Sequence, residues 1–426
     1  MSNIVIYGRG KTGMELMKML QKDNNVVLCD DKDGIDPESI EIDNTDLLAL
    51  SPGVFPTRPL VRKCLDSGVR VVSELQLAWE RFKGKTVAVT GTNGKTTVVT
   101  MLSHVLDRLG VDNILCGNVG IPFAHFADDS GIAVVECSSF QLKYCDTFSP
   151  YVSIFTNVDS DHTDYHGSVE DYIKSKCNIF RRQRDGYAIF NADDSNVLDL
   201  SGECNCRTLF YSTTNKCANC YIDGQDVVLN TVDKFIRVRS EKIATMYRHN
   251  QSNALAVLLA LYCLGVDFAE GVTAAESYTF LPHRLQLVGS CGKVDFVNDS
   301  KATNVHATLS ALKSVQGNIA LIAGGSDKDT DFHPLAKGIG SNVRLVCTIG
   351  QTADSIAACL RKTGCTVVKC SSMEEAVNVC FDSLKHCGGT VLLSPACASF
   401  DMYNSYIERG EHFTAVVKGV CSAGQG

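Results

Sequence analysis

The segment Gly91-Thr92-Asn93-Gly94-Lys95-Thr96-Thr97 has the residue types that bind a polyphosphate. Glycines let backbone N–H groups approach phosphate oxygens, a lysine supplies positive charge, and the threonine after it can ligate Mg²⁺. The common form of this loop has a further glycine at the position of Val89, so this loop is shorter. An apolar run precedes it and a helical pattern follows, which disfavours a coincidental glycine turn. The segment predicts a nucleotide phosphate site.

A second polar group follows the next predicted strands. Glu136 comes directly after the apolar residues 133–135, so in a parallel sheet its carboxylate should lie near the phosphate loop and face Thr96 as a Mg²⁺ ligand. His162 follows the strand at 151–155, and by itself is best interpreted as a hydrogen-bonded loop histidine. A transition-metal site of Asp161, His162, Asp164 and His166 is an alternative, although hard oxygen ligands favour Mg²⁺.

Two further polar segments follow apolar runs near the C-terminus. Residues 298–304 (NDSKATN) place an acid and a base among amide and hydroxyl groups, and residues 394–401 (SPACASFD) are mostly small. Lys328 follows a Gly-Gly-Ser-Asp turn. Each is either a ligand site or a solvated polar turn, and its spacing does not distinguish the two.

The N-terminus contains a second glycine pattern. Gly8, Gly10 and Gly13 form G-x-G-x-x-G after an apolar strand, and Asp30 ends the next strand, where it suits a ribose contact. The alternative is a turn that only packs a helix on a strand. The pattern indicates a nucleotide diphosphate without naming a reaction.

Strand and helix patterns alternate along the whole chain, which predicts an α/β protein with parallel sheets. The length of 426 residues suggests about three domains. We expect a Rossmann-like domain at 1–83, a central P-loop ATPase-type domain with a parallel or mixed sheet at 84–281, and a Rossmann-like domain at 282–426. Residues 81–85 are a candidate linker, and residues 254–266 a buried helix.

The composition limits the function classes. A net charge of −8 argues against a nucleic-acid partner. The N-terminus has no signal-peptide pattern, and the longest apolar run is too short to span a membrane, so we expect a cytoplasmic protein. The twenty cysteines are expected to be free thiols in a reducing compartment. Zinc binding by Cys204, Cys206, Cys217 and Cys220 is a less favoured alternative.

These motifs together resemble the Mur ligase family, whose members add amino acids to the peptidoglycan precursor. The resemblance covers nearly the whole chain through GRGKTG, SPG, GTNGKTT, GNVG, ECSSFQL, TNVDSDHTDYHGS, YIKSK, NADD, HNQSNALA, LPHR, NDSKATN and LLSPACASFDMY. The pairing of NDSKATN with SPACASFD is similar to the members that add D-glutamate.

The resemblance implies a role for each matching residue. The UDP-muramoyl substrate would contact Lys11, Thr12, Asp30, Gly53, Asn118 and His162, and D-glutamate would contact Thr303, Lys328, Ser399 and Phe400. ATP would be bound by Gly91, Thr92, Asn93, Gly94, Lys95, Thr96, Thr97, Asn253, His283, Arg284, Asp299 and Lys301. Two Mg²⁺ ions would be held by Thr96, Glu136, His162 and Lys176, with Lys176 carbamylated; Lys95, His162 and Lys176 would be catalytic.

The implied reaction joins D-glutamate to UDP-MurNAc-L-Ala at the cost of ATP, through an acyl phosphate, in a monomeric enzyme without nucleic-acid partners or membrane insertion. Closure of the third domain would exclude water from the intermediate. The alternatives are a related ligase with another amino-acid specificity and a nucleotide-binding protein without catalysis.

Overall fold

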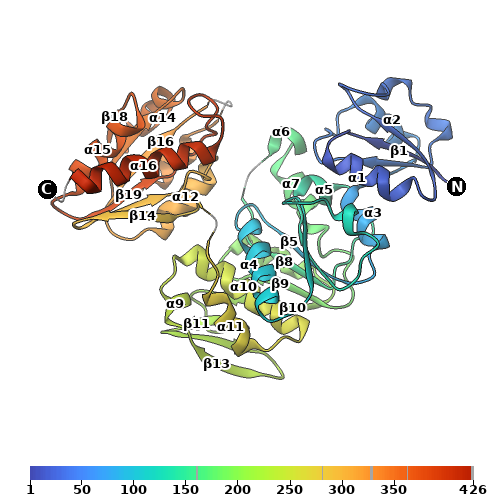
Figure 1. Ribbon diagram of the computed structural model, residues 1–426, viewed down its shortest axis with the longest axis horizontal. Coiled ribbons are helices and arrows are strands. Elements are labelled where there is room, and N and C mark those ends of the chain that lie inside the picture. The colour runs from blue at the N-terminus through green and yellow to red at the C-terminus, as the bar shows by residue number, and fades with distance from the viewer. Residues whose placement is uncertain (160–161, 281, 327–329, 362, 424–426) are drawn as a thin grey trace. The chain divides into compact units, whose positions relative to one another are not determined.

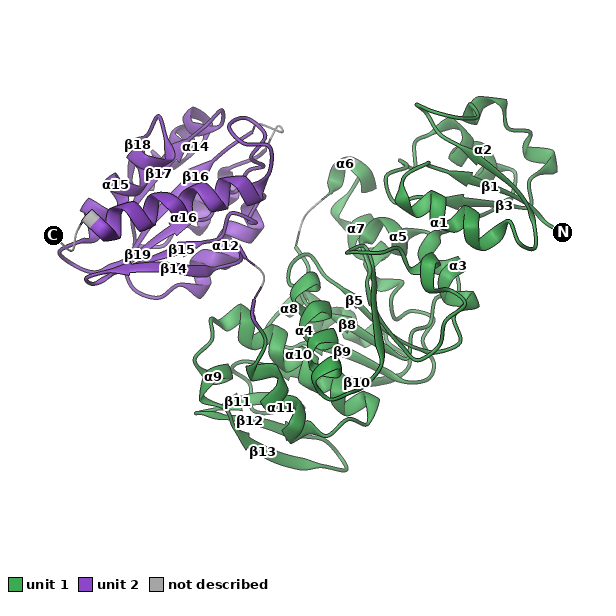
Figure 2. Ribbon diagram, in the orientation of Figure 1, with its two compact units in different colours: residues 1–278 green, residues 279–426 purple. Residues whose placement is uncertain are grey.

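The computed structural model describes residues 1–159, 162–280, 282–326, 330–361 and 363–423. The chain forms two compact units, residues 1–278 and residues 279–426 (Figure 2). Each is an α/β structure, as the sequence predicts, and each is described by itself below. No described helix is both long enough and apolar enough to cross a membrane.

The first unit begins with a small parallel sheet of order β2-β1-β3-β4 (Figure 1). Its strands are β1 (Asn3–Tyr7), β2 (Asn25–Cys29), β3 (Leu47–Leu50) and β4 (Arg70–Ser73). Its helices are α1 (Lys11–Leu20), α2 (Pro59–Asp66) and α3 (Glu74–Arg81), with short 3-10 turns at Pro37–Ser39 and Ile42–Asn44.

A larger mixed sheet forms the rest of this unit, and its described strands are ordered β13-β12-β11-β10-β9-β8-β5-β7-β6. They are β5 (Lys85–Thr90), β6 (Asn113–Gly117), β7 (Ile132–Glu136), β8 (Val152–Phe155), β9 (Tyr187–Asn191), β10 (Arg207–Ser212), β11 (Cys220–Asp223), β12 (Asp226–Asn230) and β13 (Phe235–Arg239). Neighbouring strands from β6 to β11 in this order pair in parallel, whereas β12 pairs antiparallel with both β11 and β13.

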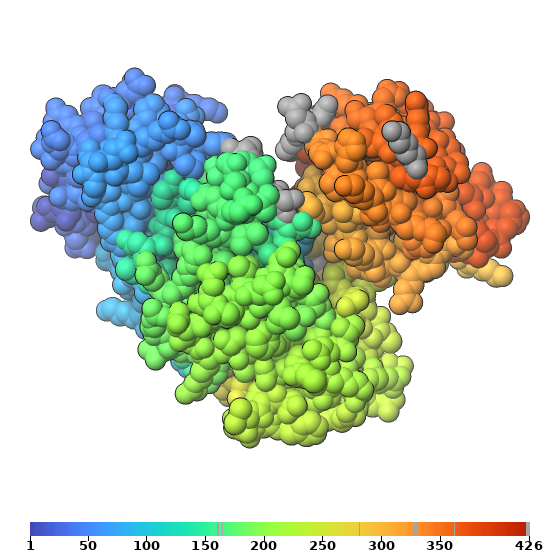
Figure 3. Space-filling view, turned by 180° about the vertical axis from the view of Figure 1, so that it is seen from behind, coloured from blue at the N-terminus to red at the C-terminus, as the bar shows by residue number. Residues whose placement is uncertain are grey.

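The helices of this part are α4 (Lys95–Arg108), α5 (Ser139–Lys143), α6 (Thr163–His166), α7 (Val169–Cys177), α8 (Ser195–Leu200), α9 (Glu241–Ala244), α10 (Arg248–Leu264) and α11 (Phe268–Glu276), with 3-10 turns at Phe123–Phe126 and Ser201–Glu203. The expected buried helix is confirmed as α10, whose residues 254–261 are fully buried. Figure 3 shows the blue N-terminal part and the green middle part of this unit packed against each other.

The second unit has a sheet of order β14-β15-β19-β16-β17-β18. Its strands are β14 (Gln286–Cys291), β15 (Val294–Asn298), β16 (Ile319–Gly324), β17 (Val343–Ile349), β18 (Thr366–Lys369) and β19 (Gly389–Leu393). Its helices are α12 (Val305–Ser314), α13 (His333–Gly338), α14 (Ala353–Leu360), α15 (Met373–Leu384) and α16 (Tyr406–Ala423).

Three features differ from the sequence expectations. The strands β11–β13 were not located from the sequence, although a mixed sheet was one of the two expectations for the central domain, and β14 makes the third sheet mixed where a parallel one was predicted. The pairs β11–β12 and β14–β15 are both β-hairpins with a tight turn. The alternation of apolar and polar residues that identifies a strand is weak in strands this short. The candidate linker joins α3 to β5, but Phe82 within it is buried with its ring 5.3 Å from that of Phe123.

The cysteines behave as the composition suggests. All twenty are free, and most are buried within the sheets and helices. Among the described residues no group of three or more His, Cys, Asp or Glu side chains is arranged to hold a metal ion, so the zinc alternative for the cysteines at 204–220 finds no support. The transition-metal alternative around His162 includes the side chains of Asp161 and Asp164, which lie outside the described residues, and it stays a prediction.

One buried carboxyl should make folding pH-dependent. Glu74, the first residue of α3, is fully buried, and its Oε1 accepts a 2.6 Å hydrogen bond from the Ala124 N–H. Burial raises the pKa of Glu74 to about 7, against the opposing effect of that bond. Because an unfolded glutamate ionises near pH 4.5, the native state loses stability as the pH rises from there to about 7, by a total of about 3 kcal/mol.

Glu74→Gln keeps an acceptor for Ala124 but has no charge to bury. We expect it to be more stable than the wild type at pH 8 and to lose this advantage towards pH 5, in urea unfolding at a series of pH values. Glu80→Gln is the control, since Glu80 lies exposed on the same helix and pairs with Arg70 at the surface. Parallel pH curves for wild type and Glu74→Gln would refute the assignment.

Candidate active site

The phosphate loop connects β5 to α4, and two of its glycines are required by their surroundings. Gly91 has φ of +146°, and a Cβ there would lie 2.0 Å from the Thr156 Oγ1. Gly94, at the start of α4, has φ of +85°, and a Cβ would lie 2.6 Å from the Asn253 Oδ1. A side chain at either position would both strain the backbone and displace a neighbour. The loop is thus a glycine-dependent cradle at a helix N-terminus, which suits an anion.

Two residues that the sequence analysis did not select hold this loop in shape. The Thr156 Oγ1 donates to the Asn93 carbonyl at 2.7 Å, and the Asn157 side chain accepts from the Asn93 N–H at 2.8 Å. Both follow β8, which pairs with β5 in parallel, so the two strands end at the same edge. Both residues belong to the motif TNVDSDH, which the sequence made visible, but only the fold shows that its first two residues contact the phosphate loop.

Lys95 and Lys176 meet at one carbonyl oxygen of the loop. The Lys95 Nζ donates to the carbonyls of Gly91 and Thr92 at 2.8 and 2.9 Å, and the Lys176 Nζ donates to Gly91 at 2.8 Å. Lys176 is 2% exposed and lies over the Tyr172 ring, 4.6 Å from its centroid. Positive charge is therefore gathered beside the cradle from two helices far apart in sequence.

Helix α7 positions Lys176. Its first turn is capped by the Ser168 hydroxyl, which accepts from the Asp171 N–H, and acidic residues there suit the positive end of the helix dipole. Tyr172 of the same helix shares a 3.0 Å hydrogen bond with the Thr92 hydroxyl. Since Tyr172 and Lys176 are one helical turn apart, this bond fixes the face of α7 that points to the loop.

Glu136 lies where the sequence predicted. It ends β7 and pairs with Val89 across the parallel ladder to β5, immediately before the loop. Its Oε1 accepts from the Asn118 Nδ2 at 2.8 Å, whereas its Oε2 is buried and has no hydrogen-bond partner among the described residues. A buried carboxylate oxygen without a partner is costly unless a cation or donor completes it. This observation fits a bound divalent cation at Glu136.

His162 belongs to the same region. It precedes α6 with a positive φ of 50°, and its ring lies 4.8 Å from that of Phe140 and 6.2 Å from that of Tyr172. His166, by contrast, is buried, bonds to the Ser139 hydroxyl at 3.0 Å, and has its pKa lowered to about 4 by burial. His166 is thus a packed core histidine. Asp161 and the side chain of Asp164 lie outside the described part of the chain.

The residues predicted for the first nucleotide site gather at the carboxyl edge of the small sheet. Lys11 and Thr12 begin α1, Asp30 follows β2 and Gly53 follows β3. The Asp30 Oδ2 accepts from the Arg9 N–H at 2.8 Å, and such bonds lower the pKa of Asp30. Helix packing also explains part of the glycine pattern, since a Cβ at Gly13 would lie 1.8 Å from the Gly8 carbonyl. The turn beyond Gly53 contacts α6, where the Tyr165 hydroxyl donates to the Val54 carbonyl at 3.0 Å.

In the second unit, the segments 298–304 and 394–401 lie side by side. They follow β15 and β19, which pair in parallel with Asn298 opposite Leu393. The Asp299 carboxylate accepts from the Ser394 hydroxyl at 2.8 Å and the Leu285 N–H at 3.2 Å. Burial raises the pKa of Asp299 to about 7 despite these bonds. The two segments therefore form one polar site and not two separate turns.

Other predicted residues of this unit lie in the loops that contain or contact Asp299. His283 has a positive φ of 64°, and its carbonyl accepts from the Lys301 N–H at 3.1 Å. The Lys301 Nζ lies 4.0 Å from the centroid of the Tyr406 ring. Ser399 is buried, whereas Phe400 is 69% exposed. Lys328 lies outside the described residues.

Comparison with known proteins gives two consistent results. Residues 89–261 match a family described as "Mur ligase middle domain", and residues 283–397 match "Mur ligase, glutamate ligase domain". A protein of Desulfitobacterium hafniense (strain DSM 10664 / DCB-2), named UDP-N-acetylmuramoylalanine–D-glutamate ligase, is 33% identical over 97% of both chains. A protein of the same name from Aquifex aeolicus is 35% identical over 97% of this chain and 98% of its own.

Solved structures share the fold at lower identity. A pseudomurein peptide ligase type C from Methanothermus fervidus superposes with a TM-score of 0.62 at 19% identity, covering 99% of this chain and all of the other. A MurF ligase from Thermotoga maritima in complex with ADP gives a TM-score of 0.60 at 16% identity, covering 99% and 95%.

Proposed function

The chain belongs to the Mur ligase family, and from this premise we propose that it joins D-glutamate to UDP-N-acetylmuramoyl-L-alanine in peptidoglycan precursor synthesis, with cleavage of ATP to ADP and phosphate. Relatives named for that reaction cover nearly the full length of this chain. The single observation that carries the chemistry is the convergence of Lys95, Lys176 and the glycine cradle beside Glu136. The twenty free thiols suit the reducing cytoplasm.

We propose that each of the three domains binds a different ligand. Residues 1–83 hold the UDP part of the substrate with Lys11, Thr12, Asp30 and Gly53, residues 84–281 hold ATP, and residues 282–426 hold the amino acid. Asn118 and His162 contact the muramoyl part. Thr303, Lys328, Ser399 and Phe400 position D-glutamate, and the remaining nucleotide contacts come from Asn253, His283, Arg284, Asp299 and Lys301.

The residues present fit Mg²⁺. Glu136 offers a buried oxygen that lacks a partner in the described structure, and Thr96 is the second residue of α4, directly after the phosphate loop. Hard oxygen donors of this kind are typical Mg²⁺ ligands. Mg²⁺ held by Thr96, Glu136, His162 and Lys176 would neutralise the charge of the transferring phosphoryl group.

The reaction follows from the weak reactivity of a carboxylate. The alanyl carboxylate of the substrate attacks the γ-phosphorus of ATP, the bond to ADP breaks, and an acyl phosphate forms. Lys95 stabilises the negative oxygens of the phosphoryl group during this transfer. The D-glutamate amine then attacks the acyl carbon, a tetrahedral intermediate collapses, phosphate leaves, and the amine loses a proton.

Lys176 is proposed to act as its carbamate. An unmodified ammonium group in this buried position adds to the charge of Lys95 and opposes a nearby cation. Addition of CO₂ to the neutral amine, with loss of a proton, converts it into an anion that can orient Mg²⁺. The carbamate retains an N–H, which can still donate to the Gly91 carbonyl.

The assignment is tested by phosphate release with ATP, UDP-MurNAc-L-Ala and either D- or L-glutamate. We expect release with D-glutamate and little with L-glutamate. Equal release with both enantiomers would indicate a different amino-acid specificity. Absence of release with either would indicate a nucleotide-binding protein without this activity.

A further inference from the structure

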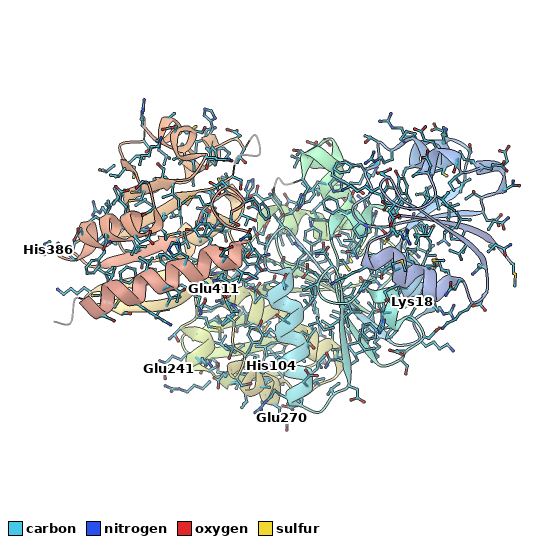
Figure 4. All side chains as sticks on the ribbon, turned by 45° about the horizontal axis from the view of Figure 1, so that its top comes forward. Lys18, His104, Glu241, Glu270, His386 and Glu411 are labelled. Atoms are coloured by element: carbon cyan, nitrogen blue, oxygen red, sulfur yellow. The ribbon has the colours of Figure 1, made fainter. Side chains whose placement is uncertain are left out.

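A buried arginine in the C-terminal helix connects the two loops of the second unit. Arg409 lies in α16, the helix on which Glu411 is labelled in Figure 4, and is 1% exposed. Its guanidinium donates to the Ser300 hydroxyl at 3.0 Å and the Ser300 carbonyl at 2.9 Å. It also donates to the carbonyls of Cys397 and Ala398 at 3.1 and 3.2 Å.

These acceptors belong to the two loops to which the proposed function assigns ligands. Ser300 lies between Asp299 and Lys301, and Ala398 directly precedes Ser399. A planar guanidinium presents its donors in a fixed fork, so it fixes the separation of two backbone segments as well as their attachment. A shift of about 1 Å in such a loop is enough to cost about 100-fold in rate.

The described acceptors of the Arg409 guanidinium are neutral oxygens, and among the described residues no carboxylate lies within ion-pair distance of it. Burial lowers the pKa of Arg409 to about 10, so it remains protonated at neutral pH. The charge of Asp401 favours the protonated form of Arg409 from a distance. The Asp401 Oδ2 itself accepts a hydrogen bond from the Gln351 N–H at 3.0 Å and not from Arg409. The buried positive charge of Arg409 should therefore favour the binding of an anionic ligand to the loops at 298–304 and 394–401.

The next residue of α16 supports a third element. A Cβ at Gly410 would lie 2.2 Å from the His283 Nδ1, so His283 packs directly on the helix backbone. The Asn298 Nδ2 joins the two by donating to the Gly410 carbonyl at 2.7 Å and approaching the His283 Nδ1 at 3.0 Å. One turn of α16 thus contacts all three proposed ligand-bearing segments.

We propose that Arg409 is a positioning residue that fixes the loops at 298–304 and 394–401 relative to each other, and thereby sets the affinity for ATP and for D-glutamate. This inference rests on the proposed function for the names of the ligands. Arg409 is not itself a proposed substrate contact; it acts through Ser300, Cys397 and Ala398.

The test compares the full-length wild type with Arg409→Met, Arg409→Lys and the matched control Arg344→Met. Arg344 is exposed on β17 of the same unit and bonds to the Asn318 side chain. For Arg409→Met we expect the KM values for D-glutamate and ATP each to rise about 10-fold or more and kcat to fall. The KM for UDP-MurNAc-L-Ala should stay within about 3-fold, because its proposed contacts lie in the first unit. Arg409→Lys should recover part of the loss, and Arg344→Met should match the wild type.

A merely structural role predicts another pattern. Thermal unfolding would then shift to lower temperature, while all three KM values measured below the transition stay as in the wild type, and that outcome overturns the proposal. Should Arg409→Met fail to fold, Ser300→Ala tests the proposal, because it removes one of the four oxygens that accept from Arg409. It should raise the KM values for D-glutamate and ATP several-fold. Unchanged KM values would overturn the proposal.

The result can be separated from a failure of the proposed function. If the wild type releases no phosphate with D-glutamate, the affinity for ADP is measured directly by titration calorimetry. Weaker ADP binding by Arg409→Met than by Arg344→Met still supports the positioning role, and equal binding overturns it.

Discussion

Replacing Lys95 with methionine is expected to lower kcat for phosphate release by about 10³-fold. Methionine has a similar length and no charge, so the transferring phosphoryl group loses the cation that the loop places beside it. The Gly91 carbonyl keeps its bond from Lys176, and the Asn93 contacts of Thr156 and Asn157 remain. The loop should therefore keep its shape, and unfolding should change by only about 1 kcal/mol. The measurement is steady-state phosphate release together with urea unfolding.

Lys85→Met is the matched control for this change. Lys85 begins β5, whereas Lys95 follows the other end of that strand. The Lys85 Nζ lies 4.4 Å from the centroid of the Tyr151 ring. It should lose cation–π stabilisation of roughly 1 kcal/mol without loss of kcat. A Lys95→Met enzyme that folds and retains more than a tenth of wild-type kcat would contradict the role given to Lys95.

Lys176→Ala should lower kcat by about 10²-fold to 10³-fold, because it removes the proposed carbamate. Added acetate or formate should restore part of the activity, since a small carboxylate can occupy the space left beside Gly91 and supply the missing negative charge. Neither anion should stimulate the wild type to a similar degree. The measurement is kcat as a function of carboxylate concentration at constant ionic strength.

The control for Lys176 lies on the same helix. Lys174 is exposed, so Lys174→Ala leaves the helix and its cap intact and should keep full activity without any response to acetate. Full activity of Lys176→Ala without a carboxylate effect would remove the carbamate from the mechanism. A loss of activity that no carboxylate restores would favour the unmodified lysine as the functional form.

Local patterns were sufficient for the nucleotide-binding half of the site. A strand, a short glycine loop and a helix follow one another in sequence, and the apolar run before Glu136 ends at the same sheet edge as the run before Gly91. In a parallel sheet all carboxyl ends lie at one edge. The order of motifs therefore predicted that Glu136 lies beside the loop.

Local patterns were insufficient where a residue's partners lie far away along the chain. The Lys176 Nζ meets a carbonyl 85 residues earlier, and Arg409 reaches Ser300 across 109 positions. Nothing in the spacing around Arg409 distinguishes a buried arginine from a solvated one on an amphipathic helix. The antiparallel strands β11–β13 were missed for a related reason, because short strands are defined by their neighbours more than by their own residues.

The sequence by itself determined that this chain is an α/β protein with a phosphate loop, and it selected the residues of the site by type and order. The tertiary structure alone decided that Lys95 and Lys176 share the Gly91 carbonyl, that the 298–304 and 394–401 segments form one site, and that Arg409 holds them together. Periodicity and turn chemistry act between near neighbours in sequence, whereas burial and hydrogen bonding between distant segments exist only once the sheets and helices have packed.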